Sequence, residues 1–424
     1  MLTQKLLVYL ITIFHLLLAD NLKGYKGYNK YTITYDNVET YRYLLDLEEN
    51  DGKVNFWSLG RNMSIAVINS ENQLIFEERL KELKAKFKNR VLLDEIACLN
   101  FSTPAESSND NLEFDEFRPK RQARGFFTHY PRYKEILNYM SILAKHYPQN
   151  CRYESLGRSF EGRHIAALSI FRNNRVRDRR VVYIQGGAHG REWIAPVTVL
   201  YLANEILGNL KTFERYLNDV EIYLVPLVNP DGYEYSHTSD RFWRKNRHQY
   251  PGRSCVGVDI NRNFANNWNR RGASANICSE VFAGTAPASE SETSAVVRYL
   301  EHNRNRIKLS VDVHSYGKFI FYPYGYSRTA YAHTRNFLHG VATRAASQIA
   351  KYRGTLYRVG TSANILYEAS GGLDDFAYGN LGIPMSFTLE LPGEDFHVPL
   401  TDIIDVCKET FAGFLELIRH ASLF

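Results

Sequence analysis

The chain has few cysteines, no extended basic block and only one long apolar run. Its 424 residues include five cysteines, carry a formal net charge of +6 and are 44% hydrophobic, which is typical of an ordered globular protein of more than one domain. No run of Lys and Arg interleaves with aromatic residues, so we expect no nucleic-acid partner. No second run of about 20 apolar residues follows the N-terminus, so we expect no membrane association after removal of that segment.

The N-terminus has the pattern of an export signal. Lys5 precedes an apolar run from Leu6 to Ala19, and Asp20 returns the chain to polar character. The run is short for a membrane span, although an N-terminal anchor is the alternative. We therefore predict that residues 1–19 are a signal peptide and that the protein is secreted to an extracellular location.

Cysteines of an exported protein tend to pair, and an odd number leaves at least one unpaired within a chain. Cys255 and Cys278 bracket a loop rich in Asn, Arg and Gly, and we expect a disulfide bond between them. Spacing leaves the pairing of Cys98, Cys151 and Cys407 open, including a bond between the last two.

A polar stretch from Asn100 to Arg124 ends in clustered basic residues, the composition of an exposed, protease-sensitive connector. We predict that residues 20–121 form an activation segment and residues 122–424 an enzyme. Cleavage by a trypsin-like or basic-site protease would follow Arg121 or Arg124. An ordinary basic linker is the alternative.

Two regions differ in their pattern of expected elements. Residues 21–99 alternate short strands with helices, which predicts a small α+β domain. Downstream, strands alternate with helices as in an α/β sheet, and the loop over 229–288 is too long to be only a connection. The elements expected in the first region are strands at Tyr31–Tyr35, Val54–Trp57 and Met63–Val67 and helices at Val38–Leu47 and Glu71–Phe87.

Chemistry-bearing residues follow three apolar runs that we predict to be buried strands. His189 and Glu192 follow the run over residues 181–184. His314 stands at the end of the run over residues 309–313, and Glu390 follows the run over residues 385–389. Strand ends of an open α/β sheet can share one site. Two imidazoles and a carboxylate, with a fourth position for water, are the ligand pattern of a catalytic zinc site. Glu390 is then available as a general base, and the sequence predicts a zinc peptidase.

A series of motifs resembles, in the same order, those of the pancreatic-type zinc metallocarboxypeptidases of the A/B group. The resemblance is to the form of these enzymes that is made as a secreted zymogen. The resemblance covers nearly the whole chain after residue 19 and is strongest from Gly157 to Glu390. Besides the segments already named, the motifs are Gly157–Arg163, Asn229–Tyr233, Arg241–Lys245, Cys255–Asn263, His314–Tyr316 and Tyr367–Gly372.

This resemblance implies a fold, a cofactor and a role for each matched residue. The implied fold is α/β, a mixed central β-sheet flanked by helices, preceded by a small α+β ferredoxin-like pro-domain. The implied enzyme is a metallocarboxypeptidase that acts on peptide and protein C-termini. The implied roles are one Zn²⁺ held by His189, Glu192 and His314, oxyanion stabilisation by Arg244, general base and acid catalysis by Glu390, binding of the terminal carboxylate by Asn261, Arg262 and Tyr367, and a neighbouring subsite at Arg191 and Tyr316.

Asp374 bears on specificity, because it stands at the position that forms the base of the side-chain pocket in the family. That position is apolar in members similar to carboxypeptidase A and Asp in those similar to carboxypeptidase B. A buried anion favours a cation, so we predict removal of C-terminal Lys or Arg. The alternatives are A-type preference for apolar ends and a non-catalytic zinc-containing protein that binds peptide C-termini.

The chain departs from the family pattern in places. Gly190 stands where Ser is commoner, a change from which we expect little consequence. Pro392 and Gly393 replace the usual Arg-Asp after the catalytic carboxylate, which alters that loop without removing a catalytic group.

Overall fold

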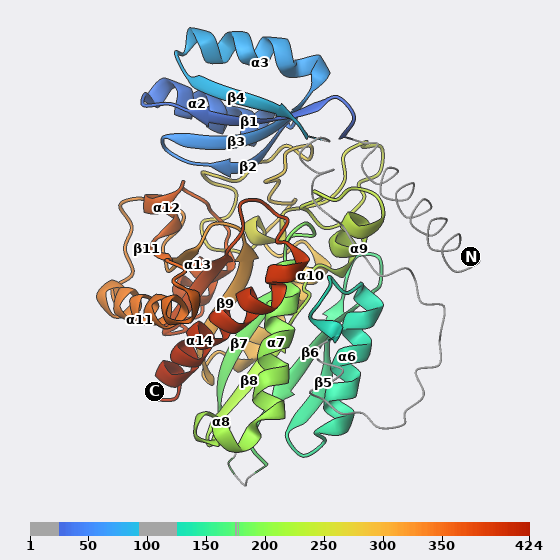
Figure 1. Ribbon diagram of the computed structural model, residues 1–424, viewed down its shortest axis with the longest axis vertical. Helices are drawn as coiled ribbons and strands as arrows, with labels where there is room; N and C mark the ends of the chain where they lie inside the picture. The colour runs from blue at the N-terminus through green and yellow to red at the C-terminus, as the bar shows by residue number, and fades with distance from the viewer. Residues whose placement is uncertain (1–24, 93–124, 174–175, 177) are drawn as a thin grey trace, which may run out of the picture.

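The structure is a computed structural model that describes residues 25–92, 125–173, 176 and 178–424. The predicted signal peptide, the basic connector with Arg121 and Arg124, and Cys98 lie outside these ranges. The described residues form a small N-terminal domain that sits on a larger one (Figure 1).

The N-terminal domain is a βαββαβ unit of the ferredoxin-like kind. Its antiparallel sheet has the order β2-β3-β1-β4, and α2 and α3 pack on one face. Its elements are β1 (Tyr28–Thr34), α2 (Val38–Asp46), the π-helical turn η2 (Leu47–Asp51), β2 (Val54–Leu59), β3 (Met63–Asn69), α3 (Ser70–Glu82) and β4 (Lys86–Val91).

The expected helix Glu71–Phe87 is wrong at its C-terminal end. Helix α3 ends at Glu82, and Lys84 adopts a left-handed conformation with φ of 58°. The backbone amide of Ala85 then bonds to the carbonyl of Leu80, a closing pattern that ends helices and redirects the chain. Residues from Lys86 onward therefore form β4, which the sequence analysis missed.

The large domain is built on an eight-stranded mixed sheet with the order β11-β10-β12-β9-β7-β8-β6-β5. Strands β12, β9, β7 and β8 are parallel in the centre, as the alternation of strands and helices predicts. The strands are β5 (Cys151–Arg158), β6 (His164–Ile170), β7 (Arg180–Gly186), β8 (Val220–Val225), β9 (Ile307–Ser315), β10 (Phe319–Phe321), β11 (Arg358–Gly360) and β12 (Met385–Leu391).

Helices cover both faces of this sheet, so its central strands are buried on both sides. One core lies under α6, α7, α11 and α14, and a second lies under α10 and α13 (Figure 1). The helices are α6 (Tyr133–His146), α7 (Ile194–Gly208), α8 (Leu210–Leu217), α9 (Pro230–Thr238), η3 (Ile260–Arg262), α10 (Ser291–Asn303), α11 (Arg335–Arg353), α12 (Ser362–Ile365), α13 (Leu373–Gly379), η4 (Leu400–Asp402) and α14 (Ile403–Ala421).

The predicted fold class is confirmed: a mixed sheet is flanked by helices and preceded by a small α+β domain. The long segment 229–288 is not wholly irregular, because it contains α9 and η3. No helix among the described residues is long and apolar enough to span a membrane.

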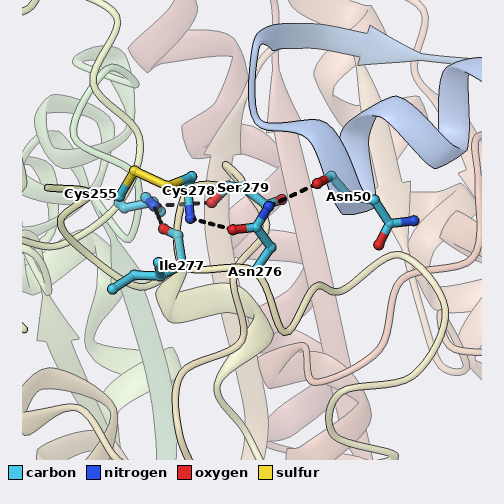
Figure 2. The surroundings of a disulfide bond; sticks show 7 residues. Asn50, Cys255, Asn276, Ile277, Cys278 and Ser279 are labelled. Carbon is cyan, nitrogen blue, oxygen red and sulfur yellow. Dashed lines mark hydrogen bonds between the residues drawn. A yellow bond between two sulfur atoms is a disulfide. The ribbon is translucent and has the colours of Figure 1, made fainter. Parts of the chain in front are cut away.

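The expected bond between Cys255 and Cys278 is present, whereas Cys151 and Cys407 are each buried and unpaired. Figure 2 shows that the bonded loop also contacts the N-terminal domain, since Asn276 Nδ2 donates to the carbonyl of Asn50 at 2.8 Å. The disulfide therefore fixes a loop on which η2 rests.

We predict that replacing both cysteines, as Cys255→Ser with Cys278→Ser, lowers the free energy of unfolding. The bond closes a segment of 23 residues, and such a loop contributes about 3 kcal/mol by restricting the unfolded chain. Chemical denaturation would show an earlier midpoint than in the wild type. Ser254→Ala, an exposed change beside Cys255, is the control, and equal midpoints for the double variant would contradict the prediction.

Candidate active site

His189, Glu192 and His314 converge at the carboxyl ends of β7 and β9, and all three are buried. Glu192 Oε1 lies 2.7 Å from His189 Nδ1, and Glu192 Oε2 lies 2.9 Å from His314 Nδ1. The two Nδ1 atoms are 3.1 Å apart. Tetrahedral ligands about 2.0 Å from a zinc ion would lie about 3.3 Å apart, so this donor set fits Zn²⁺.

Two glycines let the turn after β7 hold these ligands. Gly187 has a φ of +66°, which favours glycine. A Cβ atom on Gly190 would lie 2.3 Å from the carbonyl oxygen of Gly232, so Ser could not replace Gly190 without a shift of backbone. The position is therefore tightly packed in this chain, because the segment after β8 lies directly against it.

Asp259 links the first metal-binding histidine to Arg244. Its Oδ1 lies 3.0 Å from His189 Nε2, and its Oδ2 accepts from Arg244 Nε at 3.0 Å and Nη2 at 2.7 Å. Burial alone would raise the pKa of Asp259, but Arg244, His189 and Arg262 hold it well below its ordinary value. The charged carboxylate thereby orients both side chains.

Glu390 lies on β12 directly beside His314 in the parallel register with β9. Burial raises the pKa of Glu390 to about 8, although His314 and Arg244 oppose the shift. A carboxylate with a pKa in this range can take up and release a proton near neutral pH.

Nine of the predicted site residues line one cavity, whereas two do not. His314 lies buried beside it. Arg191 faces the N-terminal domain, where its Nη1 donates to Asn55 Oδ1 at 3.0 Å. The nine are His189, Glu192, Arg244, Asn261, Arg262, Tyr316, Tyr367, Asp374 and Glu390.

Asp374 and Asp375 have different surroundings although both begin α13. Asp374 lines the cavity, and burial and the nearby Asp312 raise its pKa to about 6 against opposing backbone hydrogen bonds. Asp375 accepts from the backbone amides of Gly325 and Tyr326, at 2.9 and 3.1 Å. Asp375 thus holds the loop at Gly325 and Tyr326, whereas the carboxylate of Asp374 faces the cavity and can contact a bound ligand.

Comparison with known proteins identifies the family of the chain. Residues 136–413 match the model of the zinc carboxypeptidase family. The chain belongs to this family. It is 37% identical over 291 residues to carboxypeptidase B of Astacus astacus, which covers 68% of this chain and 95% of that protein. It is 32% identical over 347 residues to carboxypeptidase A2 of Mus musculus, covering 80% and 82%.

A solved structure extends the similarity to the N-terminal domain. The carboxypeptidase A of Helicoverpa armigera aligns with a TM-score of 0.83 at 29% identity, over 94% of this chain and 98% of that one. The chain is therefore a metallocarboxypeptidase of the pancreatic type, a hydrolase with the expected fold. Family membership implies zinc, and the His–Glu–His set is the one metal-binding group found among the described residues.

Two carboxylates that the sequence did not reveal lie against the two histidines of the metallocarboxypeptidase site, Asp259 beside His189 and Asp312 beside His314. Asp259 lies inside a matched motif, two residues before Asn261, and only the fold reveals its contact with His189. Asp312 precedes His314 by two residues, and residues two apart on a strand share a face, so this spacing was a usable signal.

Asn246 fixes the loop that carries Arg244 and Asp259 through hydrogen bonds to both the loop and α10. Its Oδ1 accepts from the backbone amide of Val258 at 2.8 Å, which joins the two arms of the loop. Its Nδ2 donates to Glu290 Oε2 at 2.7 Å and Glu292 Oε2 at 3.1 Å, at the start of α10. Burial raises the pKa of Glu292 to about 7 against opposing hydrogen bonds from Phe160 and Asn246.

We predict that Glu292→Gln makes the stability of this metallocarboxypeptidase less dependent on pH. The pKa of Glu292 is raised in the folded state, so the folded chain keeps a proton that the unfolded chain loses above its ordinary pKa of 4.5. The free energy of unfolding therefore falls as pH rises from about 4.5 to 7, by up to about 3 kcal/mol from this group.

Denaturation of wild type and variant at pH 5 and pH 8 tests this assignment. The decrease in stability between the two pH values should be smaller in Glu292→Gln. Glu301→Gln, an exposed change on the same helix, should behave as the wild type. An equal pH dependence in all three proteins would show that Glu292 is already ionised in the folded state.

Proposed function

We propose that the protein is a zinc-dependent exopeptidase that removes C-terminal Lys or Arg and is made as an inactive, secreted precursor. The observation that carries the proposal is the single cavity that joins His189, Glu192 and Glu390 to Asp374. A peptide bond near the metal ligands and a basic side chain near Asp374 can then be held at once.

In the proposed reaction, His189, Glu192 and His314 hold one Zn²⁺. When bound, the ion acts as a Lewis acid and lowers the pKa of water. Glu390 accepts the proton of the attacking water and passes it to the leaving amine. Arg244 donates to the carbonyl oxygen as it gains negative charge. Burial would lower the pKa of Arg244, but Asp259 raises it, so the guanidinium stays charged.

Asn261, Arg262 and Tyr367 are proposed to hold the terminal carboxylate, which would restrict cleavage to the last residue. Arg262 is buried and already fixed, since its Nε donates to the carbonyl of Gly272 at 2.6 Å and its Nη1 to that of Asn261 at 2.9 Å. A guanidinium with one edge anchored presents its remaining N–H groups in a set direction, a geometry that suits a carboxylate.

Names of relatives do not decide specificity, because a carboxypeptidase B and a carboxypeptidase A2 both match at similar identity. The charge of Asp374 supports the basic preference. A buried carboxylate gains a partner when Lys or Arg enters and stays unpaired when an apolar side chain enters. The A-type alternative would leave this buried charge uncompensated.

Contacts of the N-terminal domain support the precursor, with residues 20–121 as the activation segment and 122–424 as the enzyme. Trp57 and Ser58 line the same cavity as the site, and the Trp57 ring lies 4.5 Å from that of Phe242 and 5.6 Å from that of Phe396. Glu48 is buried, and burial raises its pKa to about 7 although the nearby Arg262 and Arg244 oppose the shift. The domain thus occupies the approach to the catalytic groups, and cleavage at Arg121 or Arg124 by a trypsin-like protease would release them.

We predict that the full chain hydrolyses peptides ending in Arg or Lys only after trypsin treatment, and that a zinc chelator abolishes the activity. Glu390→Gln should then lower kcat of the cleaved protein at least a hundredfold with little change in KM, because only proton transfer is lost. Matched peptides ending in Arg, Lys, Phe, Leu or Glu provide the assay. No release by folded, zinc-loaded, cleaved protein would favour a protein that binds peptide C-termini without cleaving them.

We predict that Asp374→Ala reverses the preference between C-terminal Arg and Phe. Loss of one member of a buried ion pair costs about 3 kcal/mol, or a hundredfold or more in kcat/KM for Arg peptides. At pH values below about 6, Asp374 takes up a proton, so the wild type should hydrolyse Arg peptides less strongly relative to Phe peptides than it does at neutral pH. Asp374→Asn is the isosteric control for charge, and an unchanged ratio in both variants would reject the B-type assignment.

A further inference from the structure

A buried polar chain leads from the middle of the sheet to the metal ligand His314. The Tyr183 hydroxyl donates to Gln185 Oε1 at 2.7 Å, and Gln185 Nε2 donates to Asp312 Oδ1 at 2.9 Å. Asp312 Oδ2 lies 2.9 Å from His314 Nε2. Gln185 and Asp312 face each other in the parallel register of β7 and β9, and all four side chains are buried.

We propose that Asp312 is a positioning residue for His314, and that Gln185 and Tyr183 hold Asp312 in place for this role. The inference rests on the proposed metal site. It gives each metal-binding imidazole its own carboxylate, Asp259 behind His189 and Asp312 behind His314.

Charge supports this assignment. A carboxylate in a strand buried on both faces is costly unless a partner compensates it. Among the described residues Asp312 makes no ion pair with Lys or Arg, and the group that pairs with it is the His314 ring. Oδ2 of Asp312 makes no hydrogen bond of good angular geometry within the described part of the chain, so its contact with the His314 ring is a short N···O approach of 2.9 Å that only a small rotation of either side chain would turn into a hydrogen bond.

Asn261 also approaches the outer nitrogen of the His314 ring, but its geometry does not suit an acceptor. Its Nδ2 lies 3.3 Å from His314 Nε2, and its Oδ1 accepts from the backbone amide of Leu373 at 3.0 Å. An amide nitrogen donates, so it cannot accept an N–H from the ring. Asp312 is therefore the acceptor when the proton resides on Nε2.

The position of that proton determines whether His314 can bind a metal. Its Nδ1 faces Glu192 and His189, so the metal would bind there and the proton must lie on Nε2. A carboxylate at Nε2 selects this tautomer, fixes the ring and raises the basicity of Nδ1. Loss of such a partner typically lowers metal affinity 10- to 100-fold.

The test measures metal binding by the full chain. Wild type, Asp312→Asn and Gln185→Leu would be stripped with a chelator, and the Zn²⁺ dissociation constant measured by competition with a chromophoric chelator. The absorption spectrum of the Co²⁺ form reports ligand geometry independently of activity. We expect Asp312→Asn to raise the dissociation constant 10- to 100-fold and to alter the spectrum, and Gln185→Leu to raise it by a smaller factor.

Glu221→Gln, which removes a buried carboxylate from β8 of the same sheet, is the matched control and should leave the dissociation constant unchanged. Unfolding of the metal-free proteins separates positioning from support of the fold. Wild-type affinity in both Asp312→Asn and Gln185→Leu, with or without a loss of metal-free stability, would overturn the proposal. Failure of the wild type to bind Zn²⁺ would instead reject the proposed metal site itself.

Discussion

Asp259 joins the parts of the site that must act together. One of its oxygens meets His189 and the backbone amide of Asn261, and the other holds Arg244. The proposed metal ligand, the proposed donor to the oxyanion and the loop proposed to bind the terminal carboxylate are therefore placed relative to a single buried group. Because the carboxylate is charged and desolvated, these hydrogen bonds are stronger than neutral ones and favour one arrangement of the side chains around it.

The inhibition proposed for the N-terminal domain would act through the same groups. Glu48 brings a buried carboxylate toward Arg262 and Arg244, the cations proposed to meet the anionic groups of the substrate. Asn55 accepts from Arg191, and Trp57 packs on the aromatic rings of Phe242 and Phe396. Arg191, Arg244 and Arg262 are side chains proposed to bind the peptide, so the domain and a peptide would compete for them.

The sequence predicted the three strands of the site well, because a His or Glu beside a buried apolar run needs a partner and so marks a site. The strand ends were less exact, since β9 and β12 run to Ser315 and Leu391 and so include His314 and Glu390. The sequence predicted the α3–β4 boundary poorly. Helix α3 ends where Lys84 adopts a left-handed conformation, which lysine rarely does and which the sequence therefore does not predict. It could not predict the support of the catalytic loop either. Asn246 and Glu290 lie 44 residues apart, and only the packing of α10 beneath the loop brings them together. Motifs thus revealed the groups that do chemistry, and the fold revealed the groups that hold them.

The proposed specificity follows from an imbalance of charge inside the cavity wall. Asp374 and the nearby Asp312 are both buried, and Asp312 is one reason why the pKa of Asp374 is raised. If His314 compensates Asp312, the same ring cannot fully compensate Asp374 as well. An apolar C-terminal side chain would displace water from this carboxylate without supplying a hydrogen bond or a positive charge, so the pocket would select against it. A Lys or Arg side chain supplies the missing cation, and discrimination then depends as much on the penalty for the wrong residue as on attraction for the right one.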